Sequence, residues 1–156
     1  MPLAHALCDS LMTKRDVTFT REQIAAYAAA SGDQNPIHLD DDFARSVGLP
    51  GVIVHGMLQM GVLATVASED AGGPEHLRRL FVRFAGMVVP GDTVTFTAGR
   101  GAKGKLDLSA VNQRGEPVLT KASAEFAPSP HRGAIRRRAP SRVRDAPRAQ
   151  GEGRGA

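Results

Sequence analysis

The sequence has few aromatic residues and a single cysteine. Its 156 residues include no tryptophan, one tyrosine and six phenylalanines. An aromatic platform that stacks the bases of single-stranded nucleic acid is therefore not expected. Cys8 alone permits neither an intramolecular disulfide nor a zinc site built from cysteines. So little cysteine suits a reducing compartment, and we expect a cytoplasmic protein.

Long hydrophobic runs are also missing. A membrane-spanning helix needs about 18 consecutive apolar residues. The most apolar stretch, residues 51–67, is interrupted by His55, Gln59 and Gly61. The first 16 residues lack the cationic start and apolar block of a secretory signal. We therefore expect no membrane span, and a short disordered lead-in over residues 1–16.

The net charge of +4 is concentrated at the C-terminal end. Residues 1–130 hold 12 Lys and Arg against 14 Asp and Glu, whereas residues 131–156 hold eight Arg, one Asp and one Glu. This tail has almost no apolar side chains, so burial cannot offset the entropy cost of ordering it. We expect one folded domain over residues 17–128 and a disordered tail over residues 129–156.

Helices are predicted in the first half of the domain and strands in the second. Thr20 and Gln23 form a capping box before the first helix. The last helix has apolar side chains in nearly every direction around its axis, so we expect it to be buried. The predicted helices span residues 21–30, 41–47 and 57–69.

Apolar and polar residues then alternate with a period of two, which is typical of strands. Short turns between them predict an antiparallel meander. The predicted strands span residues 17–19, 80–85, 93–98, 106–111 and 118–126. The predicted fold class is therefore α+β, with a five-stranded antiparallel sheet wrapped around a long buried helix.

Asp33, Asn35 and His38 are the most informative cluster of polar residues. A carboxylate and an imidazole five residues apart, on a loop bent by Pro36, can converge on one small molecule. They supply the two proton-transfer groups needed to add water to a double bond or to remove it, and Asn35 can orient either group. The alternative is that Asp33 caps the next turn and His38 is an ordinary loop residue.

His55 and Gly56 precede the long helix and form a second feature. A glycine at a helix N-terminus lets an oxygen approach the backbone N–H, where the helix dipole favours negative charge. A thioester enolate needs this stabilisation. The alternative is a simple turn in which His55 packs or caps. The contiguous acidic residues 40–42 indicate a helix N-terminus, and we expect no metal site.

Residues 27–44, YAAASGDQNPIHLDDDFA, resemble the hydratase-2 signature of the MaoC-like family of hot-dog proteins. Ala30 departs from that signature, which usually has a larger aliphatic residue or glycine there. Further segments that resemble the family are residues 53–58 (IVHGML), 81–84 (FVRF) and 89–93 (VPGDT). The family includes (R)-specific enoyl-CoA hydratases and 3-hydroxyacyl thioester dehydratases, and the similarity runs from about residue 17 to residue 126.

The resemblance implies a hot-dog fold and a hydro-lyase that reversibly hydrates trans-2-enoyl thioesters to (R)-3-hydroxyacyl thioesters. It implies that Asp33 and His38 hold the reacting water, that Asn35 supports the loop, and that the Gly56 N–H polarises the thioester carbonyl. No metal or redox cofactor is implied. CoA or an acyl carrier protein belongs to the substrate and is not a bound cofactor.

Substrate contacts and partners are also implied. His55 and Arg83 are expected to bind the substrate, since family members carry a basic residue near the position of Arg83. An open sheet edge calls for pairing with a second chain. We expect a homodimer, or a heterodimer with another hot-dog chain.

Three other functions compete with hydration. A non-catalytic hot-dog subunit that only shapes an acyl pocket would not need both Asp33 and His38. A thioesterase on this fold places a carboxylate on the long helix, and residues 57–67 contain none. The Arg-rich tail is typical of nucleic-acid or anionic-membrane binding, but the acidic body disfavours this, so we expect no nucleic-acid partner.

Truncation after Pro130 should leave folding and turnover near those of the full chain, because the tail lacks a core-forming pattern. Thermal unfolding and a hydration assay of both chains would check this. A large loss of activity on truncation would contradict it.

Overall fold

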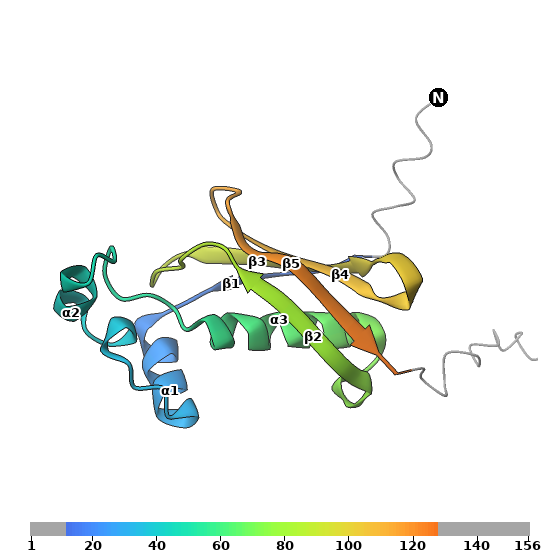
Figure 1. The fold of residues 1–156 in the computed structure, drawn as a ribbon, viewed down its shortest axis with the longest axis horizontal. Coiled ribbons are helices and arrows are strands. Elements are labelled where there is room, and N and C mark those ends of the chain that lie inside the picture. The colour runs from blue at the N-terminus through green and yellow to red at the C-terminus, as the bar shows by residue number, and fades with distance from the viewer. Residues whose placement is uncertain (1–11, 128–156) are drawn as a thin grey trace, which may run out of the picture.

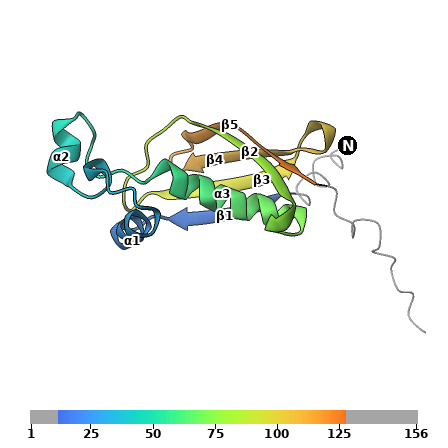
Figure 2. The same cartoon turned by 60° about the horizontal axis from the view of Figure 1, so that its bottom comes forward.

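The structure, a computed structural model, describes residues 12–127. One five-stranded antiparallel sheet, in the order β1-β3-β4-β5-β2, packs against helix α3 (Figures 1 and 2). The helices are α1 (Arg21–Ser31), α2 (Asp41–Ser46) and α3 (Gly56–Ala71). The strands are β1 (Thr13–Thr18), β2 (Leu77–Phe84), β3 (Thr93–Arg100), β4 (Leu106–Asn112) and β5 (Pro117–Phe126). The predicted tail, residues 129–156, and residues 1–11 of the predicted lead-in lie outside the described part.

The predicted α+β class with five antiparallel strands is confirmed. Alternation on the central strands is as expected, since Val94, Phe96 and Ala98 of β3 are fully buried. The capping box of α1 is also present. The Thr20 side chain accepts the Gln23 N–H at 3.2 Å, and the Gln23 side chain accepts the Thr20 N–H at 3.0 Å.

The predicted strand order is wrong in one respect. β2 pairs with β5 and not with β3, the next strand in the chain, and β1 takes the place beside β3. After β2, the N–H groups of Ala85 and Gly86 donate to the carbonyl of Val118, which holds the chain on β5 before it crosses to β3. β1 also begins at Thr13, so residues 13–16 belong to the sheet and not to a lead-in.

Around Thr120 and Lys121, β5 has one more residue than each of its neighbouring strands. Between Leu119 and Ala122 it advances three residues while β4 advances two. Lys121 lies in this bulge with a φ of 47°, a left-handed conformation that is uncommon for residues with a side chain. A second shift contains Val118, since β5 advances two residues from Pro117 to Leu119 while β4 advances one. Val118 and Leu119 are both buried, where regular alternation predicted only every second residue.

Helix α3 lies along one face of the sheet (Figure 2). Leu63, Val66 and Ala67 face the core and are fully buried. On the opposite side, Met57 is 58% exposed and Thr65 is also exposed. The single chain therefore buries one side of this helix, and not the whole circumference that the sequence predicted.

Asp41 connects three segments around the start of α3. One of its carboxylate oxygens accepts the Val52 N–H at 2.8 Å, and the other pairs with Arg21 of α1 at 2.6 Å. The sequence predicted only a favourable charge at the start of α2. Asp40 does cap that helix, accepting the N–H groups of Asp42 and Phe43. Asp41, by contrast, fixes the segment that leads into α3.

The substitution Asp41→Asn should lower the melting temperature by a few degrees, and Asp42→Asn should have almost no effect. The Val52 N–H and Arg21 hold the pKa of Asp41 below its ordinary value. Its contribution to stability is therefore complete above that ordinary pKa, and is lost as the pH falls through the lower folded-state value. Asp42 is a matched control because its side chain is fully exposed.

Thermal unfolding as a function of pH measures both effects. Equal melting temperatures for the Asp41 and Asp42 variants at neutral pH would contradict the proposed connection.

Candidate active site

The loop after α1 is shaped by hydrogen bonds from its own side chains. α1 ends at Gly32, which has a left-handed φ of 77°. Asp33 Oδ1 then accepts the Asn35 N–H at 3.3 Å, and Asn35 Oδ1 accepts the Ile37 N–H at 3.2 Å. Pro36 starts a short 3₁₀ turn, Pro36–His38. These bonds fit a supporting role for Asn35, and Asp33 also makes the turn-capping bond considered as its alternative.

Backbone pairing brings this loop onto the segment before α3. The Ile53 N–H donates to the Ile37 carbonyl at 3.2 Å, and His38 Nδ1 lies 2.8 Å from the Ile53 carbonyl oxygen. A carbonyl only accepts hydrogen bonds, so Nδ1 carries a proton, and in the neutral ring Nε2 is then an acceptor. His38 is only 8% exposed. It is therefore not an ordinary surface residue of the loop.

His55 lies beneath this loop and is only 1% exposed. Its ring stacks on that of His38, with centroids 3.7 Å apart and planes 24° apart, and it meets the Tyr27 ring at 4.9 Å. His55 Nε2 lies 3.1 Å from the backbone carbonyl oxygen of Asp33. Its Nδ1 has no hydrogen-bond partner among the described residues.

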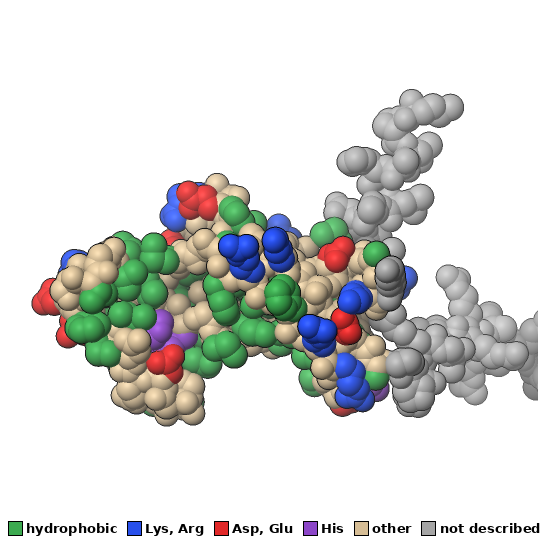
Figure 3. Space-filling model, viewed as in Figure 1, with side chains coloured by type: hydrophobic (Ala, Val, Ile, Leu, Met, Phe, Trp, Pro, Cys, Tyr) green, Lys and Arg blue, Asp and Glu red, His purple; other side chains and the backbone are tan. Residues whose placement is uncertain are grey.

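The structure brings Asp33, His38 and His55 together. One side-chain donor or acceptor atom from each lies within 4.8 Å of those of the other two. Two hydrogen bonds of about 2.8 Å span up to about 5.6 Å, so one water molecule can bridge Asp33 and His38. Asp33 is exposed. Figure 3 shows histidine side chains at the surface of this end of the molecule, bordered by hydrophobic ones.

Gly56 begins α3 beside this cluster. Its N–H belongs to the first turn of the helix, where N–H groups have no partner within the helix. A Cβ atom at Gly56 would lie 2.9 Å from Cε1 of Phe84 on β2, so a side chain here would displace the Phe84 ring. Phe84 is 49% exposed. The sequence assigned it no role, and its only signal was its place in the FVRF segment.

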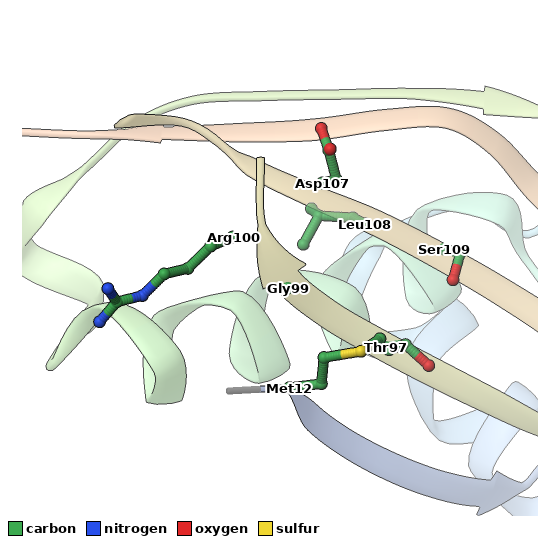
Figure 4. Close-up of a pocket in the computed structure, with 7 residues that line it drawn as sticks. All are labelled: Met12, Thr97, Gly99, Arg100, Asp107, Leu108 and Ser109. Atoms are coloured by element: carbon green, nitrogen blue, oxygen red, sulfur yellow. The ribbon is translucent and has the colours of Figure 1, made fainter. Parts of the chain in front are cut away.

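Arg83 is exposed on β2, where it pairs with Thr120 of β5. Within the described residues, no hydrogen bond or ion pair joins it to the other predicted site residues. A cavity of about 390 Å³ between β1, α1 and α3 includes Tyr27 and so adjoins His55. Another, of about 330 Å³, lies over β3 and β4 and contains none of the predicted site residues (Figure 4).

Across residues 12–127, no helix has both the length and the apolar character needed to cross a bilayer.

Comparison with known proteins places this geometry in a family. Residues 4–122 match the model of the MaoC like domain. A peroxisomal hydratase-dehydrogenase-epimerase of Neurospora crassa is 33% identical over 112 residues, which cover 72% of this chain and 12% of that protein.

Solved structures agree with this assignment. The (R)-hydratase from A. caviae involved in PHA biosynthesis aligns with a TM-score of 0.64 and 28% identity, over 72% of this chain and 90% of that chain. Full-length peroxisomal multifunctional enzyme type 2 from Drosophila melanogaster aligns with a TM-score of 0.65 and 28% identity, over 73% of this chain and 22% of that chain. The resemblance seen in residues 27–44 is thus confirmed, and the chain belongs to the family of MaoC-like domains.

Proposed function

We propose that this chain adds water to trans-2-enoyl thioesters, giving (R)-3-hydroxyacyl thioesters, and catalyses the reverse reaction. The observation that carries the proposal is the convergence of Asp33 and His38 beside the N-terminus of α3. The similarity to the structure of the (R)-hydratase from A. caviae supports it. The chain spans only 12% of the Neurospora relative, whose other activities are not part of the proposal.

The site residues divide the chemistry between them. The water between Asp33 and His38 attacks C3 of the enoyl group, and His38 Nε2 is available as a proton acceptor because Nδ1–H is bonded to Ile53. The resulting enolate oxygen is stabilised by the Gly56 N–H and the positive end of α3. The pair returns a proton to C2. The enzyme is therefore unchanged after each addition of water.

The proposal includes no metal and no redox cofactor. Adding water transfers no electrons, so the reaction needs no redox group. Asp33, His38 and His55 lie close enough to suggest a metal site. However, the two histidine rings are stacked with their planes only 24° apart, so in-plane lone pairs from both rings do not readily meet at one ion. One nitrogen of each ring also already lies against a carbonyl oxygen. CoA or an acyl carrier protein enters as part of the substrate, with Arg83 free to contact a phosphate.

The competing functions find less support. A thioesterase would need a carboxylate on α3 near the site, and the first one in that helix is Glu69, close to its far end. We also propose a cytoplasmic location, because a chain with a single cysteine suits a reducing compartment. The Neurospora relative is named as a peroxisomal protein, so a peroxisomal location is the alternative.

The substitutions Asp33→Asn and His38→Gln should each lower kcat by at least about 100-fold. Asparagine can still accept the Asn35 N–H, so the melting temperature should change little. The double variant should lose much less than the product of the two losses, because both groups act on one water. Hydration of enoyl-CoA substrates of several chain lengths, with chiral analysis of the product, is the measurement.

Gln34→Asn is the matched control, since the exposed Gln34 side chain makes no hydrogen bond within the described residues. Full activity in the Asp33→Asn variant would contradict the roles given to Asp33 and His38, and a parent chain without activity would favour the non-catalytic subunit instead.

We also propose that two copies of the chain pair, or that it pairs with another hot-dog chain. β2 is an edge strand and carries Phe81 and Phe84, which are 50% and 49% exposed. Apolar side chains on an open edge favour association. Met57 on the outer side of α3 adds to this surface.

Sedimentation of the purified chain at micromolar concentration should show a dimer. Phe81→Glu should weaken the dimer, whereas Lys14→Glu on the opposite edge strand, β1, should leave it intact. A monomeric parent chain, with no other hot-dog chain present, would show that two copies do not pair.

A further inference from the structure

His55 contacts both residues of the proposed catalytic pair but is itself almost inaccessible. Its side chain is 1% exposed, lies against the Asp33 carbonyl and stacks on the His38 ring. A substrate contact, which the resemblance led us to expect, does not fit this burial. We propose instead that His55 is a positioning residue that holds Asp33 and His38 at a fixed separation; this inference rests on the proposed function.

The first contact fixes the backbone of Asp33. Because a carbonyl oxygen is only an acceptor, the 3.1 Å contact requires His55 to donate through Nε2–H. Nδ1 is then an acceptor, and it has no partner within the described residues. This tautomer is the better one, since buried N–H groups without a partner are rarer than buried acceptors without one. The bond anchors the loop at the residue from which the carboxylate projects.

The second contact fixes the ring of His38. The bond from Nδ1–H to the Ile53 carbonyl holds one edge of this ring. The His55 ring, with its centroid 3.7 Å away, packs on the face of the His38 ring and further limits its turning about the Cβ–Cγ bond. Tyr27 meets the His55 ring at 4.9 Å and fixes its orientation in turn. With Nδ1 held by Ile53, Nε2 is the nitrogen of His38 that remains to contact the water proposed to lie between His38 and Asp33.

Two variants of His55 separate these contacts. His55→Gln keeps an N–H donor near the position of Nε2 but removes the ring. His55→Phe keeps a ring for stacking but leaves the Asp33 carbonyl without its donor. His76 is a matched control, since it lies beyond the other end of α3, in the turn Pro74–His76. His76→Gln should therefore match the parent chain in every measurement.

Kinetics with an enoyl-CoA test the positioning role. We expect kcat of His55→Phe to fall about 100-fold, the size of loss that a misplaced catalytic group causes. His55→Gln should recover about tenfold of that loss, and KM should stay within about threefold of the parent value in both variants. A tenfold rise in KM with unchanged kcat would overturn the proposal in favour of substrate binding. Unchanged kcat in both variants would overturn it as well.

Nuclear magnetic resonance gives a second test that needs no substrate. Long-range coupling between ring protons and nitrogens should show the Nδ1–H form for His38 and the Nε2–H form for His55. The Ile37 amide, bonded within the loop, should exchange faster in His55→Phe but not in His55→Gln. An Nδ1–H form of His55, or equal exchange in both variants, would overturn the proposal.

Different results would overturn the proposed hydration activity and the positioning role of His55. A parent chain that hydrates no enoyl thioester overturns the proposed function. The tautomers and the Ile37 exchange still decide whether His55 holds the loop.

Discussion

The site depends on the pairing of Ile53 with Ile37 and His38, through one bond between backbone groups and one from the His38 side chain. Without it, the loop after α1 and the N-terminus of α3 would be separate features of the surface. The pairing places His38 on His55 and brings Asp33 within reach of both. In the neutral ring it also sets the tautomer of His38, because a proton on Nδ1, bonded to the Ile53 carbonyl, leaves Nε2 without one. The same contacts thus determine both the position of His38 and the ring nitrogen that can accept a proton.

Helix α3 serves the core and the site at once. Its sheet-facing side supplies Leu63, Val66 and Ala67 to the interior, and its first residue, Gly56, supplies an unpaired N–H beside the catalytic pair. Because the helix is held along most of its length, its N-terminus is held too. Phe84 reaches the same place from β2, so the wall of the site belongs to an edge strand of the sheet.

The sequence predicted those features that depend on interactions between residues close together in the chain. The capping box of Thr20 and the alternation through Phe96 needed only neighbouring residues, and both were found as expected. The position of β2 beside β5 and the bulge at Lys121 depend on contacts across the sheet, so alternation alone could not reveal them. The stacking of His38 on His55, 17 residues apart in the chain, likewise follows from tertiary pairing. The sequence named both residues but could not show that they touch.

The ends of the described chain lie far from the site. β1 begins and β5 finishes at the end of the sheet opposite α1 and α2 (Figures 1 and 2). The proposed catalytic groups, in contrast, come from a compact run between Asp33 and Gly56. The chain therefore enters and leaves residues 12–127 on the side of the molecule far from the proposed catalytic groups. Further sequence can thus be joined to this domain without starting beside the site. This arrangement suits a family whose members also occur inside much longer polypeptides.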